Sequence, residues 1–77
     1  MQVKTFERTL RKFNRRVPFT SFIVELVSGT RIKVDHPEAL AFGGGEAVYI
    51  NPSGDFTFFD HEGVSRITDE RGVVESP

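Results

Sequence analysis

The 77-residue chain has no cysteine and a formal net charge of −1, which excludes disulfides and thiolate zinc sites. Its length predicts one domain with a thin hydrophobic core that a partner or self-association completes. No apolar run reaches the roughly 20 residues of a membrane span, and the amphipathic N-terminus differs from a secretory signal. We therefore expect a cytoplasmic protein.

The first predicted element is an amphipathic helix over about residues 3–14. Its apolar side chains recur at the spacing of one helical face, and they are Val3, Phe6, Leu10 and Phe13. Residues 1–16 hold six Lys or Arg and one Glu, a net charge of +5, whereas residues 17–77 carry −6. This asymmetry indicates either a solvated helix face or a contact surface for phosphates or an acidic partner.

The next predicted element is a β-hairpin between Phe22 and Val34. Apolar residues alternate along both arms, which is the period of a strand with one buried face. Ser28-Gly29 lies between the arms, and we expect Gly29 to adopt the positive φ of a tight turn.

Further strands follow the hairpin, and the second strand is interrupted at Pro37. Proline lacks the N–H that a strand ladder needs, so residues 39–42 resume only as an extended or single-turn segment. In the third strand we expect Val48 and Ile50 to face inward. The five predicted strands are 21–28, 30–35, 46–50, 56–60 and 64–68.

This order of elements predicts the fold class. A helix followed by five short antiparallel strands with tight turns indicates a mainly β protein, a small SH3-like or Sm-like barrel. We expect a single domain over residues 1–77, with the barrel at about 19–68 and a polar tail at 69–77.

Several segments between residues 10 and 68 resemble a widespread family of small bacterial proteins with an Sm-like fold. They are LRKFNRR, Pro18-Phe19, FIVELVSGT, VDHPEALAF and Val64-Ser65-Arg66-Ile67. The order of helix and alternating strand is also similar to the bacterial Sm-like RNA chaperones. That resemblance implies a homo-oligomeric ring of five to seven subunits that binds single-stranded RNA.

The resemblance and the basic segment together suggest nucleic-acid-binding candidates: Arg11, Arg15, Arg16, His36, Phe59 and His61. The RNA chaperones carry Tyr-Lys-His where this chain has Phe59-Asp60-His61. The acid at the lysine position repels phosphate. The alternative hypothesis is a homo-oligomeric interaction or scaffolding module without a nucleic-acid role.

The segment Phe56-Thr57-Phe58-Phe59 points to self-association. Phe56 and Phe58 share one face of a strand and Phe59 takes the other, so we expect burial on both faces, under the helix or another subunit. In Sm-like rings the fourth strand pairs with the fifth strand of the next subunit. The predicted interface comprises Phe56, Phe58, Phe59, Val64, Arg66 and Ile67.

The sequence gives little support for catalysis, and we expect neither an enzyme nor a cofactor. The glycine run before Glu46 lacks the lysine and serine of a phosphate loop. Asp35-His36 and Asp60-His61 would need to meet before they could hold a metal, and the simpler interpretation is that these side chains bond to nearby backbone groups.

Overall fold

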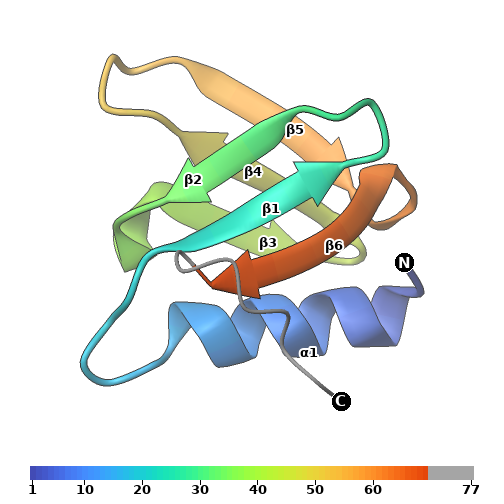
Figure 1. Cartoon of the computed structure of the whole chain (residues 1–77), viewed down its shortest axis with the longest axis horizontal. Coiled ribbons are helices and arrows are strands. Elements are labelled where there is room, and N and C mark those ends of the chain that lie inside the picture. The colour runs from blue at the N-terminus through green and yellow to red at the C-terminus, as the bar shows by residue number, and fades with distance from the viewer. Residues whose placement is uncertain (70–77) are drawn as a thin grey trace.

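The computed structural model describes residues 1–69, in which one helix packs against two three-stranded antiparallel sheets (Figure 1). Sheet A has the strand order β2-β1-β6, and sheet B has the order β3-β4-β5. The helix and strands are α1 (Val3–Asn14), β1 (Phe22–Leu26), β2 (Arg31–Val34), β3 (Leu40–Gly43), β4 (Glu46–Ile50), β5 (Phe56–Asp60) and β6 (Val64–Asp69). Two short 3-10 helices, η1 (Pro37–Ala39) and η2 (His61–Gly63), connect the sheets.

The prediction of a mainly β fold with an N-terminal helix is confirmed, but the five-stranded barrel is wrong. The structure has six strands in two separate sheets. The second predicted strand ends at Val34, because Pro37 begins η1 and cannot donate to a ladder. Leu40–Gly43 then pairs with β4 as a strand of its own.

The β1–β2 hairpin forms as predicted. Its register places Val24 opposite Ile32 and Phe22 opposite Val34, with all four side chains buried. Gly29 in the turn has a φ of 94°, which a side chain would resist.

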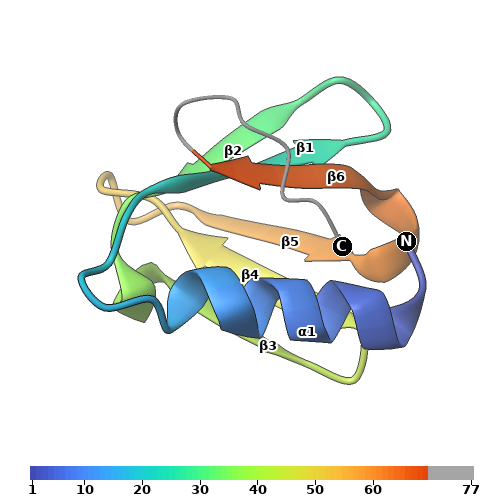
Figure 2. The ribbon, with the colours of Figure 1, turned by 60° about the horizontal axis from the view of Figure 1, so that its bottom comes forward.

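The core lies between the inner faces of both sheets, and α1 covers it between β6 and β3 (Figure 2). Phe6, Leu10 and Phe13 are buried, as their helical spacing predicts, whereas Val3 at the first turn is 40% exposed. The docked stripe explains why so short a helix is stable.

The inward face of β4 is the opposite of the predicted one. Ala47 and Tyr49 are buried, whereas Val48 is half-buried and Ile50 is exposed. Ala47 lies directly opposite Phe59, so the small side chain leaves room for the large ring beside it. Choosing the β-branched aliphatic residues as the buried set therefore selects the wrong face.

The C-terminal boundary also differs from its prediction. Asp69 is the last residue of β6 and is buried, so it does not begin a polar tail. The rest of that predicted tail, residues 70–77, lies outside the described residues. In residues 1–69 no helix has the length and apolar character needed to cross a bilayer.

Candidate functional site

Each sheet has two outer strands, and the far edge of each pairs with no other strand in residues 1–69. In sheet B they are β3 and β5, and β5 pairs with β4 alone. In sheet A they are β2 and β6, and β6 pairs with β1 alone. Unpaired backbone N–H and C=O groups along such edges are ready to accept another strand.

The outer face of sheet B carries exposed apolar side chains, which we call the apolar patch. Phe58 is 75% exposed and Phe56 is 62% exposed, and their ring centroids are 6.4 Å apart. The cross-strand register sets the patch, since Val48 lies between Ala41 and Phe58 and Ile50 lies opposite Phe56. Its members are Ala41, Val48, Ile50, Phe56 and Phe58.

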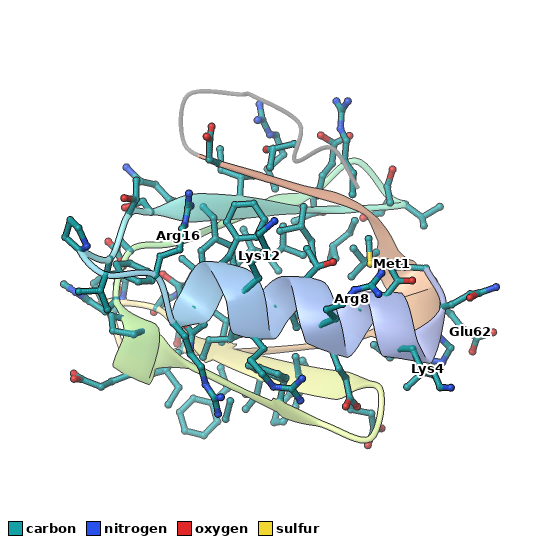
Figure 3. All side chains as sticks on the ribbon, turned by 90° about the horizontal axis from the view of Figure 1, so that it is seen from below. Met1, Lys4, Arg8, Lys12, Arg16 and Glu62 are labelled. Carbon is teal, nitrogen blue, oxygen red and sulfur yellow. The ribbon has the colours of Figure 1, made fainter. Side chains whose placement is uncertain are left out.

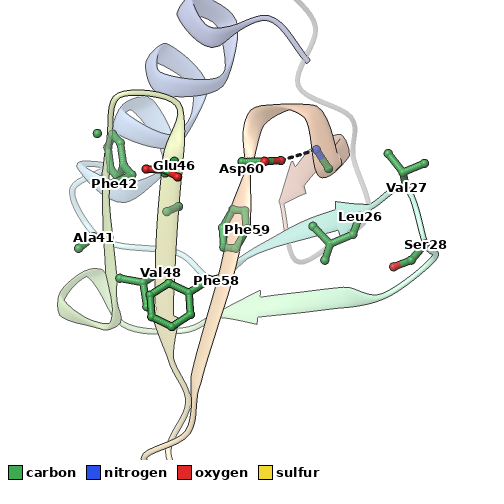
Figure 4. A pocket seen from close by; sticks show the side chains of 13 residues that line it. Leu26, Val27, Ser28, Ala41, Phe42, Glu46, Val48, Phe58, Phe59 and Asp60 are labelled. Atoms are coloured by element: carbon green, nitrogen blue, oxygen red, sulfur yellow. Dashed lines mark hydrogen bonds between the residues drawn. The ribbon is translucent and has the colours of Figure 1, made fainter.

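An open groove of about 900 Å³ runs from this patch to the turn between β1 and β2 (Figure 4). Leu26 and Val27 line it on the side of the turn, while Val48 and Phe58 line it on the side of sheet B. Val27 is 71% exposed. The groove is therefore apolar on both sides and open to solvent.

The charged side chains of sheet B and its connecting segments are all acidic, apart from the histidines. Residues 35–65 contain six Asp or Glu and no Lys or Arg. Glu46 and Asp60 line the groove and lie directly opposite each other on β4 and β5. Like charges in this position repel, so this end of the patch favours a cation.

Half of the predicted interface side chains are not on the surface. Phe59, Val64 and Ile67 are all buried in the core of the single chain. Phe59 faces inward because β5 alternates, and its ring packs edge-on against Phe6 with centroids 6.2 Å apart. These three side chains are thus already used for packing.

The remaining three predicted interface residues are exposed. Arg66 lies on the outer face of sheet A and donates to Glu25 at 3.3 Å. Phe56 and Phe58 have no cover within the described part of the chain, so the helix is not their cover, and burial under another subunit stays a prediction. The helix covers only the side that Phe59 occupies.

The predicted nucleic-acid residues are spread over several parts of the structure. Arg11 and Arg15 are exposed on α1 and belong to a row of exposed cations that we call the basic stripe. Figure 3 shows its members Lys4, Arg8 and Lys12 along the helix. This stripe consists of Lys4, Arg8, Arg11, Lys12 and Arg15. Within residues 1–69, Lys4, Arg8, Arg11 and Arg15 make no ion pair with another side chain.

Arg16 differs from the stripe. Its guanidinium lies 4.5 Å from the ring centroid of Phe13, and its Nε and Nη2 atoms are buried without a hydrogen-bond partner. It therefore packs against the helix rather than presenting its charge to solvent.

The two histidines lie at opposite ends of α1. His36 is exposed next to Pro37, whose carbonyl accepts a hydrogen bond from Asn14 Nδ2 at 3.2 Å near the end of the helix. His61 lies at the start of the helix, where its Nδ1 donates to the Met1 carbonyl at 2.8 Å. With Phe59 in the core, the six residues do not form one site.

A cluster of hydrogen bonds that the sequence analysis missed joins the N-terminal part of α1 to the turn between β3 and β4 and to η2. Gly45 N donates to Glu7 Oε2 at 2.7 Å, and His61 N donates to the Gly45 carbonyl at 2.8 Å. A Cβ on Gly45 would lie 2.9 Å from His61 Cδ2. The triple-glycine run was its only sequence signal.

The groove residues Leu26, Ala41 and Glu46 were also missed. Their sequence neighbourhoods contain no motif. The pairing of β4 with β3 and β5 places Ala41 and Glu46 in sheet B, and Leu26 lines the groove from β1 of sheet A. No single-sequence pattern could have identified them.

Two further polar side chains, Asp60 and Tyr49, are explained by their immediate surroundings. Asp60 Oδ1 accepts from Gly63 N at 2.9 Å and so caps η2, as the simpler interpretation of Asp60-His61 predicts. Burial raises the pKa of the Tyr49 phenol; the Asp35 carboxylate raises it further, and Lys33 opposes both. No group of three metal-ligating side chains gathers among the residues that the structure describes.

Comparison with known proteins gives no family for this chain: no family model, no curated protein and no solved structure matches it.

Proposed function

We propose that this chain is a self-assembling, Sm-like interaction module that joins copies through the outer edges of β5 and β6. Its role would be binding rather than catalysis. The observation that carries the proposal is that the outer edge of β5 pairs with no strand in residues 1–69, and that β5 bears the two most exposed phenylalanines of that range, Phe56 and Phe58.

The composition of β5 supports pairing at this edge. Edge strands that stay single are usually protected by lysine, proline or a bulge. The segment Phe56–Asp60 contains no lysine or proline, and its register with β4 runs without a bulge. An added strand would satisfy its backbone groups and cover part of the phenylalanine rings.

A contact between β5 of one copy and β6 of the next joins two different edges. Such a head-to-tail contact forms a ring if the rotation closes. The resemblance to Sm-like proteins supports a ring of five to seven copies. The small core of a chain this short gives assembly a further thermodynamic reason.

Sedimentation velocity at roughly 100 μM tests the proposal, since micromolar association would populate the assembly at this concentration. We expect an oligomer for the unmodified chain and a monomer for Phe56→Asp, because assembly would bury an unpaired charge. The matched control is Val17→Asp, since Val17 is 96% exposed and lies outside both edges. A monomeric unmodified chain contradicts the proposal.

A second candidate function is the binding of single-stranded RNA by the basic stripe. The specific observation is a row of exposed cations without ion pairs in the described chain, at Lys4, Arg8, Arg11 and Arg15. Such a row would contact phosphates without regard to base sequence.

Labelled RNA oligonucleotides titrated across a salt series test this second function. Phosphate contacts require that the logarithm of the binding constant fall linearly with the logarithm of salt concentration. We expect Arg11→Glu with Arg15→Glu to flatten that slope, while the control Arg31→Glu in sheet A leaves it unchanged. Absence of binding at low salt eliminates this candidate and leaves the interaction module without a nucleic-acid role.

A further inference from the structure

The outer face of sheet B combines exposed apolar side chains with an excess of negative charge. Val48 and Phe58 lie side by side across β4 and β5. Glu46 and Asp60 form the next cross-strand pair on the same face of these strands. All four line the groove that reaches to the β1–β2 turn (Figure 4). An exposed apolar patch of this kind marks a contact surface.

The charge of this face defines what can cover it. Glu46 and Asp60 are the two carboxylates of residues 1–69 that line the groove, and no Lys or Arg of that range lines it. Glu46 and Asp60 are direct cross-strand neighbours, and Asp60 is already held by its bond to Gly63 N. A ligand that places a cation beside Glu46 would relieve the repulsion between the two carboxylates.

A second copy of this chain fits the face poorly. The basic stripe could supply cations, but Phe6, Leu10 and Phe13 of its helix are buried and cannot contact Val48 or Phe58, which leaves only the small side chain of Val3, at 40% exposure, for an apolar contact. A second sheet B would bring its own carboxylates to the contact. Nucleic acid would be repelled by the same charge.

We propose that the outer face of sheet B docks a cationic segment of another protein, one that carries bulky apolar side chains next to Lys or Arg. The apolar side chains enter the groove between Phe58 and Val27, and a cation lies beside Glu46 and Asp60. This extends the interaction role of the proposed function but is independent of assembly. A strand added to the β5 edge lies in the plane of the sheet, whereas these side chains project out of that plane.

The test uses the full chain and a fluorescein-labelled nine-residue peptide in which lysine alternates with leucine. Two control peptides replace every lysine by glutamate or every leucine by serine. Fluorescence anisotropy should show that the lysine–leucine peptide binds at least about tenfold more tightly than either control. Equal affinity for the lysine–serine peptide would reduce the contact to charge alone and overturn the proposal.

Matched variants locate the contact. Phe58→Ser and Glu46→Gln should each weaken peptide binding by about fivefold or more, and Glu46→Gln should also reduce its salt dependence. The controls are Val17→Ser, at a 96% exposed position, and Glu62→Gln, outside the groove, and both should leave affinity unchanged. Circular dichroism melting checks that each variant is folded. If Phe58→Ser leaves peptide affinity unchanged while it remains folded, the proposal is wrong.

Sedimentation of the same samples separates this inference from assembly. A monomeric chain that still binds the lysine–leucine peptide upholds the inference even though the proposed function fails. Conversely, if Phe58→Ser abolishes self-association and no peptide binds the unmodified chain, the face belongs to a second copy and the inference is overturned.

Discussion

The outer faces of the two sheets differ in how the carboxylate on the central strand is paired. In sheet A, Glu25 on the central strand lies between Arg31 and Arg66, with Oε1 3.9 Å from Arg31 Nε and 3.3 Å from Arg66 Nη2. In sheet B, Glu46 on the central strand faces Asp60 and Gly43. Sheet A therefore balances its own charges, whereas sheet B leaves carboxylates to be balanced from outside.

The apolar residues show the same contrast. Ile23 on the outer face of sheet A is half-buried and lies between Lys33 and Thr68. Phe58, on the edge strand of sheet B, is 75% exposed. The exposure of phenylalanine beside unbalanced charge on sheet B supports the contact that we propose for this face.

The largest expected change in the free energy of unfolding comes from comparing substitutions on the two faces of β5. Phe59→Asp buries a charge without a partner and should remove about 3–5 kcal/mol from the free energy of unfolding, because Phe59 lies in the core against Phe6. Phe58→Asp should change it by no more than about 0.5 kcal/mol in monomeric samples. Urea denaturation measures both, and similar losses would contradict the assignment of the two faces.

A second comparison concerns the hairpin turns of the two sheets. Gly29 and Gly45 both have positive φ, so alanine at either position should cost about 1 kcal/mol or more. Gly45→Ala should cost more than Gly29→Ala, since only its Cβ would contact His61 at 2.9 Å, while the space around Gly29 is open. Thermal melting of the two variants tests this order, and equal losses would show that His61 moves aside freely.

Charge reversal on the central strands should have smaller effects of opposite sign. Glu25→Arg places a cation between Arg31 and Arg66 and should lower the free energy of unfolding by about 0.2–1 kcal/mol. Glu46→Arg turns a repulsive neighbour of Asp60 into an attractive one and should raise it by a similar amount. Denaturation at low salt is the measurement, and the same sign for both variants would refute the contrast between the sheets.

The smallest expected change in stability at neutral pH comes from the ionisation of Tyr49, on the inner face of sheet B. Burial raises the pKa of its phenol above the ordinary value of 10.0, and the Asp35 carboxylate raises it further. The folded chain thus holds this proton more tightly than the unfolded chain. The resulting stability is complete below about pH 10 and is lost as pH rises through the folded-state pKa.

Denaturation midpoints measured from neutral to alkaline pH check this dependence, with Tyr49→Phe as the matched control. Because Tyr49 is the only tyrosine of the chain, its absorbance reports its ionisation directly. An alkaline loss of stability that is as large in the variant would assign the effect to other groups.

Local sequence patterns determined the helix, the first hairpin and the opposite facing of Phe58 and Phe59. These features depend on helical spacing, on strand alternation and on a glycine turn, all of which act over a few residues. The order of the elements was enough to predict a mainly β protein with an N-terminal helix. The same patterns also placed Arg11 and Arg15 on a solvent face.

Tertiary structure alone decided which face of β4 is buried, because Ala47 rather than Val48 had to lie beside the ring of Phe59. It also decided that Leu40–Gly43 pairs as a separate strand after η1. The candidate site depended most on such pairing. Glu46 meets Asp60, and Ala41 meets Val48, only through strand registers that no local pattern encodes, since register is set by packing between segments far apart in the chain.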